Sequence, residues 1–379
     1  MINSNKDEMI MGLVHYFVTE ENYTPISVHG VKNEIWLENL DAPYKIIRIN
    51  SKYIHNDEQF KVDIFRMQYV IKQIKKKTMS LKMNALNICL DMNSSVKMNI
   101  NSKVIDSINV KEINDFKNNF DINKIFPKAK DNNFEIGNDI MNIINITEDI
   151  NKKTQEENSK YENVFQEKPI IITKVLIIIN IFMYIISLLI SDNFNESLYL
   201  LGANNRYLVL SGEVWRLLTC AFLHGSLLHL VVNMYSLWIV GSQVEKYIGR
   251  IKYIAIYLLS ALMGSMFSIL FLDNSLSVGA SGAIFGLMGS LLYFGYHYRL
   301  YLSNTLIHQL VPLIIINLVI GFSASGIDNW AHIGGLIGGY LSTMMVGLKY
   351  KSTKSDIING TIVYTILFVF LIYAVLNLV

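Results

Sequence analysis

Two patterns of apolar and polar residues divide the chain near residue 168. Before that point, short runs rich in β-branched and aromatic residues predict strands in the segments YTPISV, EIWLE, YKIIRI and ALNICL. An amphipathic helix is expected ahead of them from the apolar stripe of Met9, Leu13, Tyr16 and Phe17. A second, longer helix is expected over residues 57–77. Residues 1–98 are therefore predicted to form a small soluble α+β domain.

Residues 99–167 follow a different composition. They are rich in Asn, Lys, Asp and Ile and contain a single proline. We interpret this stretch as a polar, weakly structured linker. The small α+β domain shows no nucleophile motif, phosphate-binding loop or metal-spaced cluster. Whether residues 1–167 bind a cytosolic partner or a ligand stays open.

From residue 168 onward, apolar residues form seven stretches of nearly the length, roughly 20 residues, that a helix needs to cross a bilayer. They lie near residues 170–190, 226–246, 251–272, 279–297, 306–322, 331–348 and 359–378. Lys and Arg occur in every second short connection, which places the N-terminus in the cytoplasm and the C-terminus outside. The long loop at 191–225 breaks this pattern with Arg206 and Arg216, so we expect local structure there.

Composition agrees with this division. The 379 residues include 33 Lys and Arg and 31 Asp and Glu, and 51% are apolar, which excludes a disordered chain or a protein that coats nucleic acid. Two cysteines provide no disulfide framework. The first residues lack the pattern of a secretory signal, so the polar part is expected to stay in the cytoplasm.

Four polar side chains lie in or at the ends of predicted spans that begin on the outer side. His229 and Asn233 are four residues apart in the second span, Ser281 opens the fourth and His332 opens the sixth. Polar groups at membrane depth are costly and are usually functional. Their similar depth therefore predicts one site just below the outer surface.

Ser281 has the setting of a nucleophile. Gly279 and Gly282 leave room for a close approach, and backbone amides at the start of a helix can bind an oxyanion. His332 is the only histidine that opens another outward-starting helix, so it is the candidate base. No metal or other cofactor is required by this chemistry.

The remaining site residues follow from packing. Close contact between the fourth and sixth spans is expected from the small residues Gly282, Gly286, Ala331, Gly335 and Gly339. His229 and Asn233 share a helix face and can donate to a developing oxyanion. Asp328 precedes His332 in a loop and can cap the sixth span, so we predict a Ser/His dyad without a third carboxylate.

These residues together resemble the rhomboid family of intramembrane serine proteases. The similarity covers roughly residues 170–378, and its motif residues are Gly279, Ser281, Gly282, His332, Gly335, Gly339, His229, Asn233, Trp215, Arg216, Gly241 and Glu245. The resemblance implies that Ser281 is the nucleophile, that His332 is the base, and that His229 and Asn233 form the oxyanion hole. Phe285 stands where many relatives carry a tyrosine against the histidine ring.

The resemblance also implies an architecture and a class of substrate. Residues 168–379 would form an all-α polytopic bundle, a six-helix rhomboid core with a seventh C-terminal helix. The substrates would be transmembrane segments of other proteins in the bilayer, cut at the extracytoplasmic side of the cell membrane. No nucleic acid is expected as a partner.

Two other interpretations stay open. A transporter-like bundle would carry charges at span centres, and none are found there. A catalytically silent rhomboid-like adaptor would bind transmembrane helices for quality control without cutting them. We expect Cys220 to be packed, Arg216 to brace the long loop through Glu213 or Glu245, and His224 to have no role.

Overall fold

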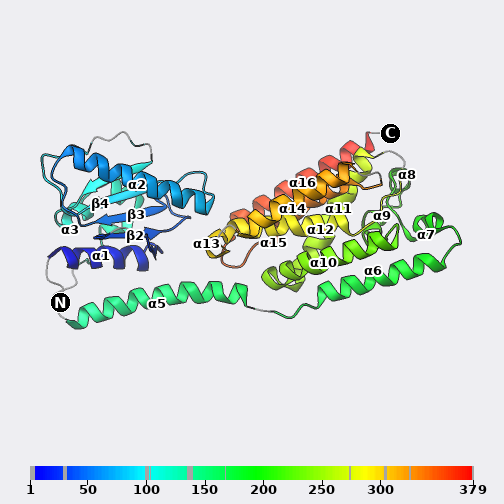
Figure 1. Cartoon of the computed structure of the whole chain (residues 1–379), viewed down its shortest axis with the longest axis horizontal. Coiled ribbons are helices and arrows are strands. Elements are labelled where there is room, and N and C mark those ends of the chain that lie inside the picture. Colours follow the sequence, from blue (N-terminus) through cyan, green and yellow to red (C-terminus); the bar gives the residue numbers. More distant parts are fainter. Residues whose placement is uncertain are drawn as a thin grey trace. The chain divides into compact units, whose positions relative to one another are not determined.

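The computed structural model describes residues 5–28, 32–98, 102, 104–134, 140–166, 168–272, 275–302, 305–323 and 326–377. The chain divides into two compact units, residues 1–160 and 161–379. The first is built on a β-sheet and the second on long helices (Figure 1). The predicted fold class, a helical membrane bundle preceded by a small α+β unit, is confirmed.

The strands of the first unit form one sheet in chain order. They are β1 (Thr24–Ile26), β2 (Glu34–Glu38), β3 (Ile46–Asn50), β4 (Ala85–Cys89) and β5 (Ile105–Asn109). β1, β2 and β3 pair antiparallel, whereas β4 and β5 continue the sheet in parallel. A parallel neighbour requires a crossover, and α2 (Asp57–Thr78) provides it between β3 and β4.

Helices cover both faces of this sheet, which explains why its inner strands are apolar on both sides. Ile47 and Leu86 pack in one core with α1 (Asn5–Thr19). Their neighbours Ile46 and Ala85 pack in another core with α2. This follows from the alternation of side chains along a strand.

The prediction of a weakly structured linker over residues 99–167 is wrong for the described residues. After β5 come α3 (Ile113–Lys117), α4 (Phe120–Ile125), the 3₁₀ turn η1 (Pro127–Ala129) and α5 (Ile140–Phe165). Phe116, Phe126 and Phe134 enter the core that α1 closes. A few widely spaced aromatic residues thus anchor a segment whose average composition is polar, and the first unit extends to residue 160 rather than 98.

The second unit contains a long helix at each of the seven predicted spans. These are α6 (Ile172–Leu189), α10 (Leu227–Ile248), α11 (Arg250–Phe271), α12 (Ser281–His297), α14 (Thr305–Ser323), α15 (Asn329–Val346) and α16 (Lys354–Leu376). Five of them, all but α12 and α15, are long and apolar enough to cross a membrane. The chain is therefore a multi-pass membrane protein.

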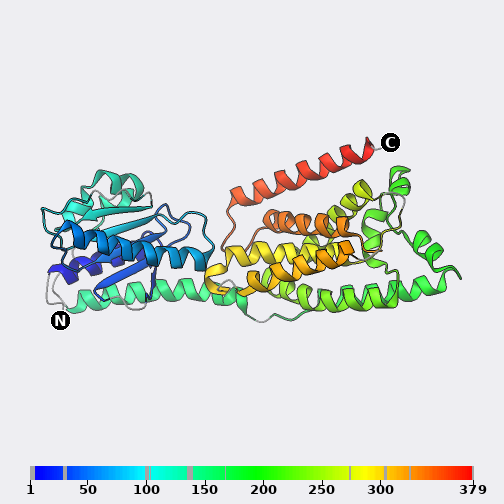
Figure 2. The ribbon, with the colours of Figure 1, turned by 45° about the horizontal axis from the view of Figure 1, so that its top comes forward.

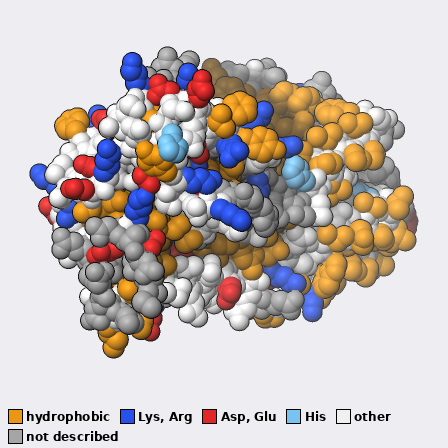
Figure 3. Space-filling view, turned by 60° about the vertical axis from the view of Figure 1, so that its left-hand side comes forward, with side chains coloured by type: hydrophobic (Ala, Val, Ile, Leu, Met, Phe, Trp, Pro, Cys, Tyr) orange, Lys and Arg blue, Asp and Glu red, His pale blue; other side chains and the backbone are white. Residues whose placement is uncertain are grey.

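α12 and α15 are rich in glycine, and they lie inside the bundle. Figures 1 and 2 show α11, α12 and α15 in the middle, with α6 and α16 at opposite edges. The peripheral helices expose large apolar side chains such as Ile178, Phe182 and Ile366. Hydrophobic side chains accordingly gather over the membrane helices in the space-filling view (Figure 3), as a lipid-facing surface requires.

The first unit encloses a charged network between the sheet and α2. The guanidinium of Arg48 donates to both carboxylate oxygens of Asp63 at 2.6 and 2.7 Å, and its Nε donates to Glu34 at 2.8 Å. Lys52 also donates to Glu34, at 2.7 Å. Burial opposes ionisation of Glu34, but its hydrogen bonds and its attraction to these two cations hold its pKa below the ordinary value.

This network predicts acid lability of the first unit. Because the pKa of Glu34 is lowered on folding, its stabilising effect is present above the ordinary pKa and is lost as the pH falls from about 4.5 through the lowered value. Glu34→Gln should cost about 3–5 kcal/mol at neutral pH, because Arg48 loses a buried partner. The loss of stability caused by Glu34→Gln should be smaller at acidic pH. Protection of α2 amides from hydrogen exchange, corrected for intrinsic exchange rates at each pH, measures both effects.

The matched control is Glu58→Gln, since Glu58 is exposed on the first turn of the same helix. Its effect at neutral pH should be much smaller. Equal protection of α2 in wild type and Glu34→Gln at neutral pH would contradict the importance of the network.

Candidate active site

Ser281 and His332, 51 residues apart in the sequence, form a hydrogen bond in the bundle. The Oγ of Ser281 lies 2.8 Å from Nε2 of His332. Ser281 is the first residue of α12, and His332 lies in the first turn of α15. Both helices begin at the same end of the unit, as the predicted topology required, so the serine and the histidine lie side by side.

Glycines allow this hydrogen bond because they let the backbones of α12 and α15 come into contact. A Cβ placed on Gly335 would come within 3.0 Å of the carbonyl oxygen of Gly282, and one on Gly339 equally close to that of Gly286. Real Cβ atoms are essentially never found so near to another atom. The contact therefore depends on the missing side chains, as in other small-residue helix interfaces in membranes.

The imidazole of His332 is held from one side by an aromatic ring. Phe285, one turn after Ser281, stacks on it with ring centroids 4.3 Å apart and planes inclined by only 8°. Both side chains are buried. A phenylalanine can thus fix the ring plane without a hydroxyl group.

No carboxylate of the described residues bonds to the other nitrogen of His332. Its Nδ1 is buried and has no hydrogen-bond partner there. Asp328 caps α15 by accepting from the amide of Ala331 at 2.9 Å, and it accepts from Ser277 Oγ at 2.6 Å. Among the described residues, Ser281 and His332 thus form a hydrogen-bonded pair, and Asp328 caps the start of α15.

His229 and Ser281 both lie close to Gly279. Gly279 has φ +135°, a conformation that favours glycine, and a Cβ on it would lie 2.8 Å from Nε2 of His229 and 3.6 Å from Oγ of Ser281. His229 Nε2 and the serine hydroxyl therefore flank the same small space. Asn233, one turn deeper on α10, is buried and donates to the carbonyl of His229 at 2.9 Å.

His224 also lies near His229, although we predicted no role for it. It is fully buried, its ring centroid is 5.2 Å from that of His229, and neither ring nitrogen has a partner among the described residues. The two histidines are five residues apart across the start of α10, so no helical periodicity links them. Among the described residues, no group of three or more His, Cys, Asp or Glu side chains could hold a metal ion.

The long loop between α6 and α10 is folded, as its two arginines suggested. It contains α7 (Phe194–Leu201), α8 (Arg206–Leu210), α9 (Arg216–Thr219) and η2 (Cys220–Phe222). Arg216 is buried, pairs with Glu213 at 2.7 Å and donates to the carbonyls of Tyr199 and Ala203 at 2.8 and 3.0 Å. The predicted brace is thus present, with Glu213 rather than Glu245 as its partner. Trp215 is exposed beside it.

This loop is tied to the segment that leads into α12. The amide of Gly279 donates to the carbonyl of Cys220 at 3.0 Å, and Asn204 exchanges two backbone hydrogen bonds with Ser277. The Cys220 side chain is packed, as expected, with its Sγ 3.2 Å from Ser265 Oγ. The loop therefore positions the residues just before Ser281.

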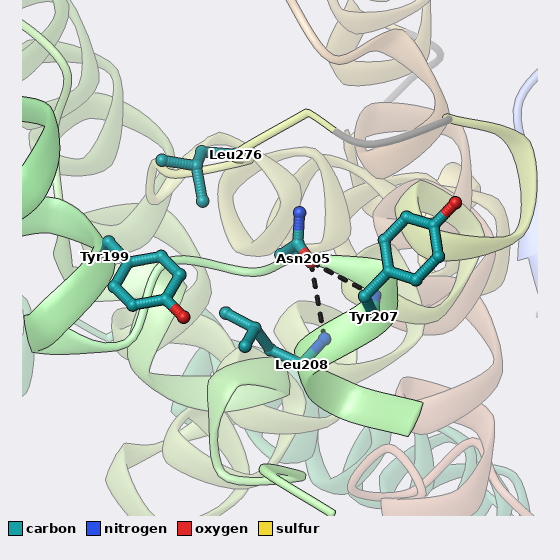
Figure 4. A pocket seen from close by; sticks show the side chains of 5 residues that line it. All are labelled: Tyr199, Asn205, Tyr207, Leu208 and Leu276. Atoms are coloured by element: carbon teal, nitrogen blue, oxygen red, sulfur yellow. Dashed lines mark hydrogen bonds between the residues drawn. The ribbon is translucent and has the colours of Figure 1, made fainter. Parts of the chain in front are cut away.

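A cavity of about 580 Å³ opens within the same loop, apart from the serine and histidine. Its lining residues are Tyr199, Asn205, Tyr207, Leu208 and Leu276 (Figure 4). The Asn205 side chain is already used as the cap of α8, since it accepts from the amides of Tyr207 and Leu208. Nothing in this lining adds chemistry to the pair.

Glu245 lies far from Ser281 and anchors a helix instead. It is buried near the end of α10, 16 residues or about 24 Å along the helix from His229. Its carboxylate accepts from the amides of Ile171, Ile172 and Thr173 at 2.8 to 2.9 Å. The predicted supporting role is therefore at the start of α6.

The structure defines a polytopic membrane protein in which a half-buried serine is hydrogen bonded to a buried histidine near one end of its helices. Comparison with known proteins gives the family. The family model of the Rhomboid domain matches residues 211–349. Residues 211–349 therefore belong to the Rhomboid domain family.

Curated relatives agree with this membership. Over 196 residues the chain is 41% identical to rhomboid protease GluP of Bacillus subtilis (strain 168), a stretch that covers 51% of this chain and 38% of that protein. It is 41% identical over 142 residues to RHOMBOID-like protein 4 of Arabidopsis thaliana, 37% of this chain and 36% of that one. Inactive RHOMBOID-like protein 8 of Arabidopsis thaliana is 38% identical over 138 residues, 36% and 39% of the two chains. The matches thus span less than two thirds of each relative.

The glycine contact between α12 and α15 predicts a strong effect of one methyl group. Gly339→Ala should destabilise the membrane unit by about 1–3 kcal/mol, because the new Cβ meets a backbone carbonyl that cannot move aside. In an ordinary helix the same change stabilises by about 1 kcal/mol. The thermal unfolding midpoint of the purified protein in detergent measures the effect.

Gly225→Ala is the matched control. A Cβ there would meet Val278 and His229 at 3.8 and 4.0 Å, which are ordinary contacts. We expect this variant to unfold like the wild type. An unchanged midpoint for Gly339→Ala would show that the helices do not depend on this contact.

Proposed function

We propose that this protein is an intramembrane serine protease that hydrolyses a peptide bond in or near the transmembrane segment of other membrane proteins. The observation that carries the proposal is the 2.8 Å hydrogen bond between Ser281 and His332 at the starts of two membrane helices. Membership of the rhomboid family and the similarity to a bacterial rhomboid protease support it.

In the proposed reaction, Ser281 Oγ attacks the carbonyl carbon of the scissile peptide while His332 Nε2 takes its proton. Phe285 holds the imidazole plane so that Nε2 faces the serine. The tetrahedral intermediate then expels the amine of the new C-terminal fragment, which receives the proton from His332. Water, activated by the same histidine, hydrolyses the acyl ester and restores the serine.

The negative charge that forms on the substrate carbonyl oxygen needs donors. The amide of Ser281 lies at the start of α12, where backbone N–H groups have no helical partner. His229 faces the same small space beside Gly279, and we assign it to the oxyanion hole together with Asn233. Because Asn233 donates to the His229 carbonyl, the proposed contribution requires its other N–H or a small rotation of its amide.

The orientation of the protein in the membrane follows from the positions of Lys and Arg. Lys and Arg in the connections beside residues 168, 250 and 350 put these ends of the helices in the cytoplasm of the proposed cell-membrane protein. Ser281 then lies near the extracytoplasmic surface, from which water enters. A helical substrate hides its carbonyls in internal hydrogen bonds, so the preferred substrates contain locally unstable helix.

A second candidate function is a rhomboid-like adaptor that captures transmembrane helices without cutting them. One relative at 38% identity is described as inactive, so membership of the family does not by itself establish catalysis. In this chain both the serine and the histidine are present and hydrogen bonded. This favours the protease.

Labelling with a fluorescent fluorophosphonate tests whether Ser281 is activated. The detergent-purified wild type should be labelled, Ser281→Ala should not be, and His332→Ala should be labelled at least about 100-fold more slowly because the serine loses its base. In-gel fluorescence over time gives the rates.

Ser290→Ala and His308→Ala are matched controls, since Ser290 lies deeper in α12 and His308 is exposed on α14. Both should be labelled like the wild type. Unchanged labelling of Ser281→Ala would contradict the proposed nucleophile. A folded wild type that is not labelled would favour the adaptor.

A further inference from the structure

The first unit contains a cavity of about 580 Å³ that the proposed protease activity does not use. It lies where the C-terminal end of α2 meets the segments that enter β4 and β5. Met79, in the left-handed conformation with φ +49°, ends the helix and turns the chain toward β4. Three separate segments thus enclose the space.

The charges around this cavity are all positive. Lys72 and Lys75 line it from α2, and Lys82 lines it from the segment before β4. No Asp or Glu is among its described lining residues. These three ammonium groups have no hydrogen-bond or ion-pair partner among the described residues, in contrast to Lys52, which pairs with Glu34.

Complementing the helix dipole does not account for this arrangement. Lys75, Lys76 and Lys77 all lie in the last turn of α2, where cations are favourable. Only Lys75 of these faces the cavity, and Lys82 lies outside the helix altogether. The convergence of Lys72, Lys75 and Lys82 on one hollow therefore needs another explanation.

The other lining residues give the cavity a polar and an apolar side. Gln68, Asn84 and Ser102 add uncharged hydrogen-bonding groups. Leu81 and Val104 line the cavity although they are largely exposed to solvent, Leu81 to 87%. Large apolar side chains that border a charged hollow are suited to a ligand with both kinds of surface.

We propose that this cavity binds a phosphate-bearing anion with an apolar portion. Lys72, Lys75 and Lys82 would donate to the phosphate oxygens, since ammonium groups form strong charge-assisted hydrogen bonds with phosphate. Leu81 and Val104 would contact the apolar portion. An anionic phospholipid headgroup and a soluble phosphate compound share this chemistry.

The test uses the full chain in nanodiscs of neutral phosphatidylcholine. In the first arm, inorganic pyrophosphate is titrated and the dissociation constant is measured by calorimetry. In the second arm, phosphatidylglycerol is included in the nanodisc, and hydrogen exchange is followed in peptides that cover residues 68–84. Binding in either arm identifies the source of the phosphate.

The combined variant Lys72→Gln, Lys75→Gln and Lys82→Gln should weaken pyrophosphate binding at least about 10-fold, or abolish the slowing of exchange by phosphatidylglycerol. The control Lys61→Gln, Lys111→Gln and Lys124→Gln removes the same charge from exposed positions outside the cavity. It should retain both responses. If the two variants lost binding equally, net charge alone would explain the effect and the proposal would be overturned. A wild type that responds to neither pyrophosphate nor phosphatidylglycerol would also overturn it.

Discussion

The contact between the backbones of α12 and α15 is the constraint on which the membrane unit depends. Lipid tails are as apolar as leucine, so helices in a bilayer gain little from burying large apolar side chains and associate through close packing. Gly335 and Gly339 on α15 lie directly against the carbonyls of Gly282 and Gly286 on α12. Because the two helices are so close, a short serine side chain at the start of one reaches a histidine on the other.

The polar groups of the membrane unit divide into two kinds. Glu245 and Arg216 are buried, but their hydrogen-bonding capacity is used by the start of α6 and by the loop between α6 and α10. The buried nitrogens of His224 and Nδ1 of His332 have no partner among the described residues. Buried polar groups are costly unless they are paired. The first kind stabilises the fold, and the second gathers where we propose that a substrate and water bind.

Much of this arrangement could be predicted from the sequence. Hydropathy located every long membrane helix to within a few residues, because a span must be long and apolar. The alternation of Lys and Arg between connections indicates which helices start at the same end of the bundle. It therefore predicted that Ser281, His332 and His229 lie close together. These inferences rest on local periodicity and on the bilayer, which act on every residue of a span. The place of Phe285 against the histidine ring was implied only by the resemblance to the rhomboid family.

The remaining features depend on contacts that no local pattern records. Phe116, Phe126 and Phe134 order a segment whose average composition is polar, and only their shared core with α1 reveals it. His224 meets His229 across the irregular start of α10. Arg216 had two candidate acids, and the fold of the loop decides for Glu213. Tertiary packing determines each of these contacts.

Proteolysis in a defined bilayer tests the central claim most directly. The full chain is reconstituted in liposomes with a single-pass reporter whose transmembrane helix is locally unstable, and the fragments are mapped by mass spectrometry. We predict that the wild type cuts the reporter at a bond in or beside its transmembrane segment, and that Ser281→Ala, reconstituted equally well, leaves it intact. Equal cleavage by the two proteins, or an intact reporter with both, would contradict an intramembrane protease that uses Ser281.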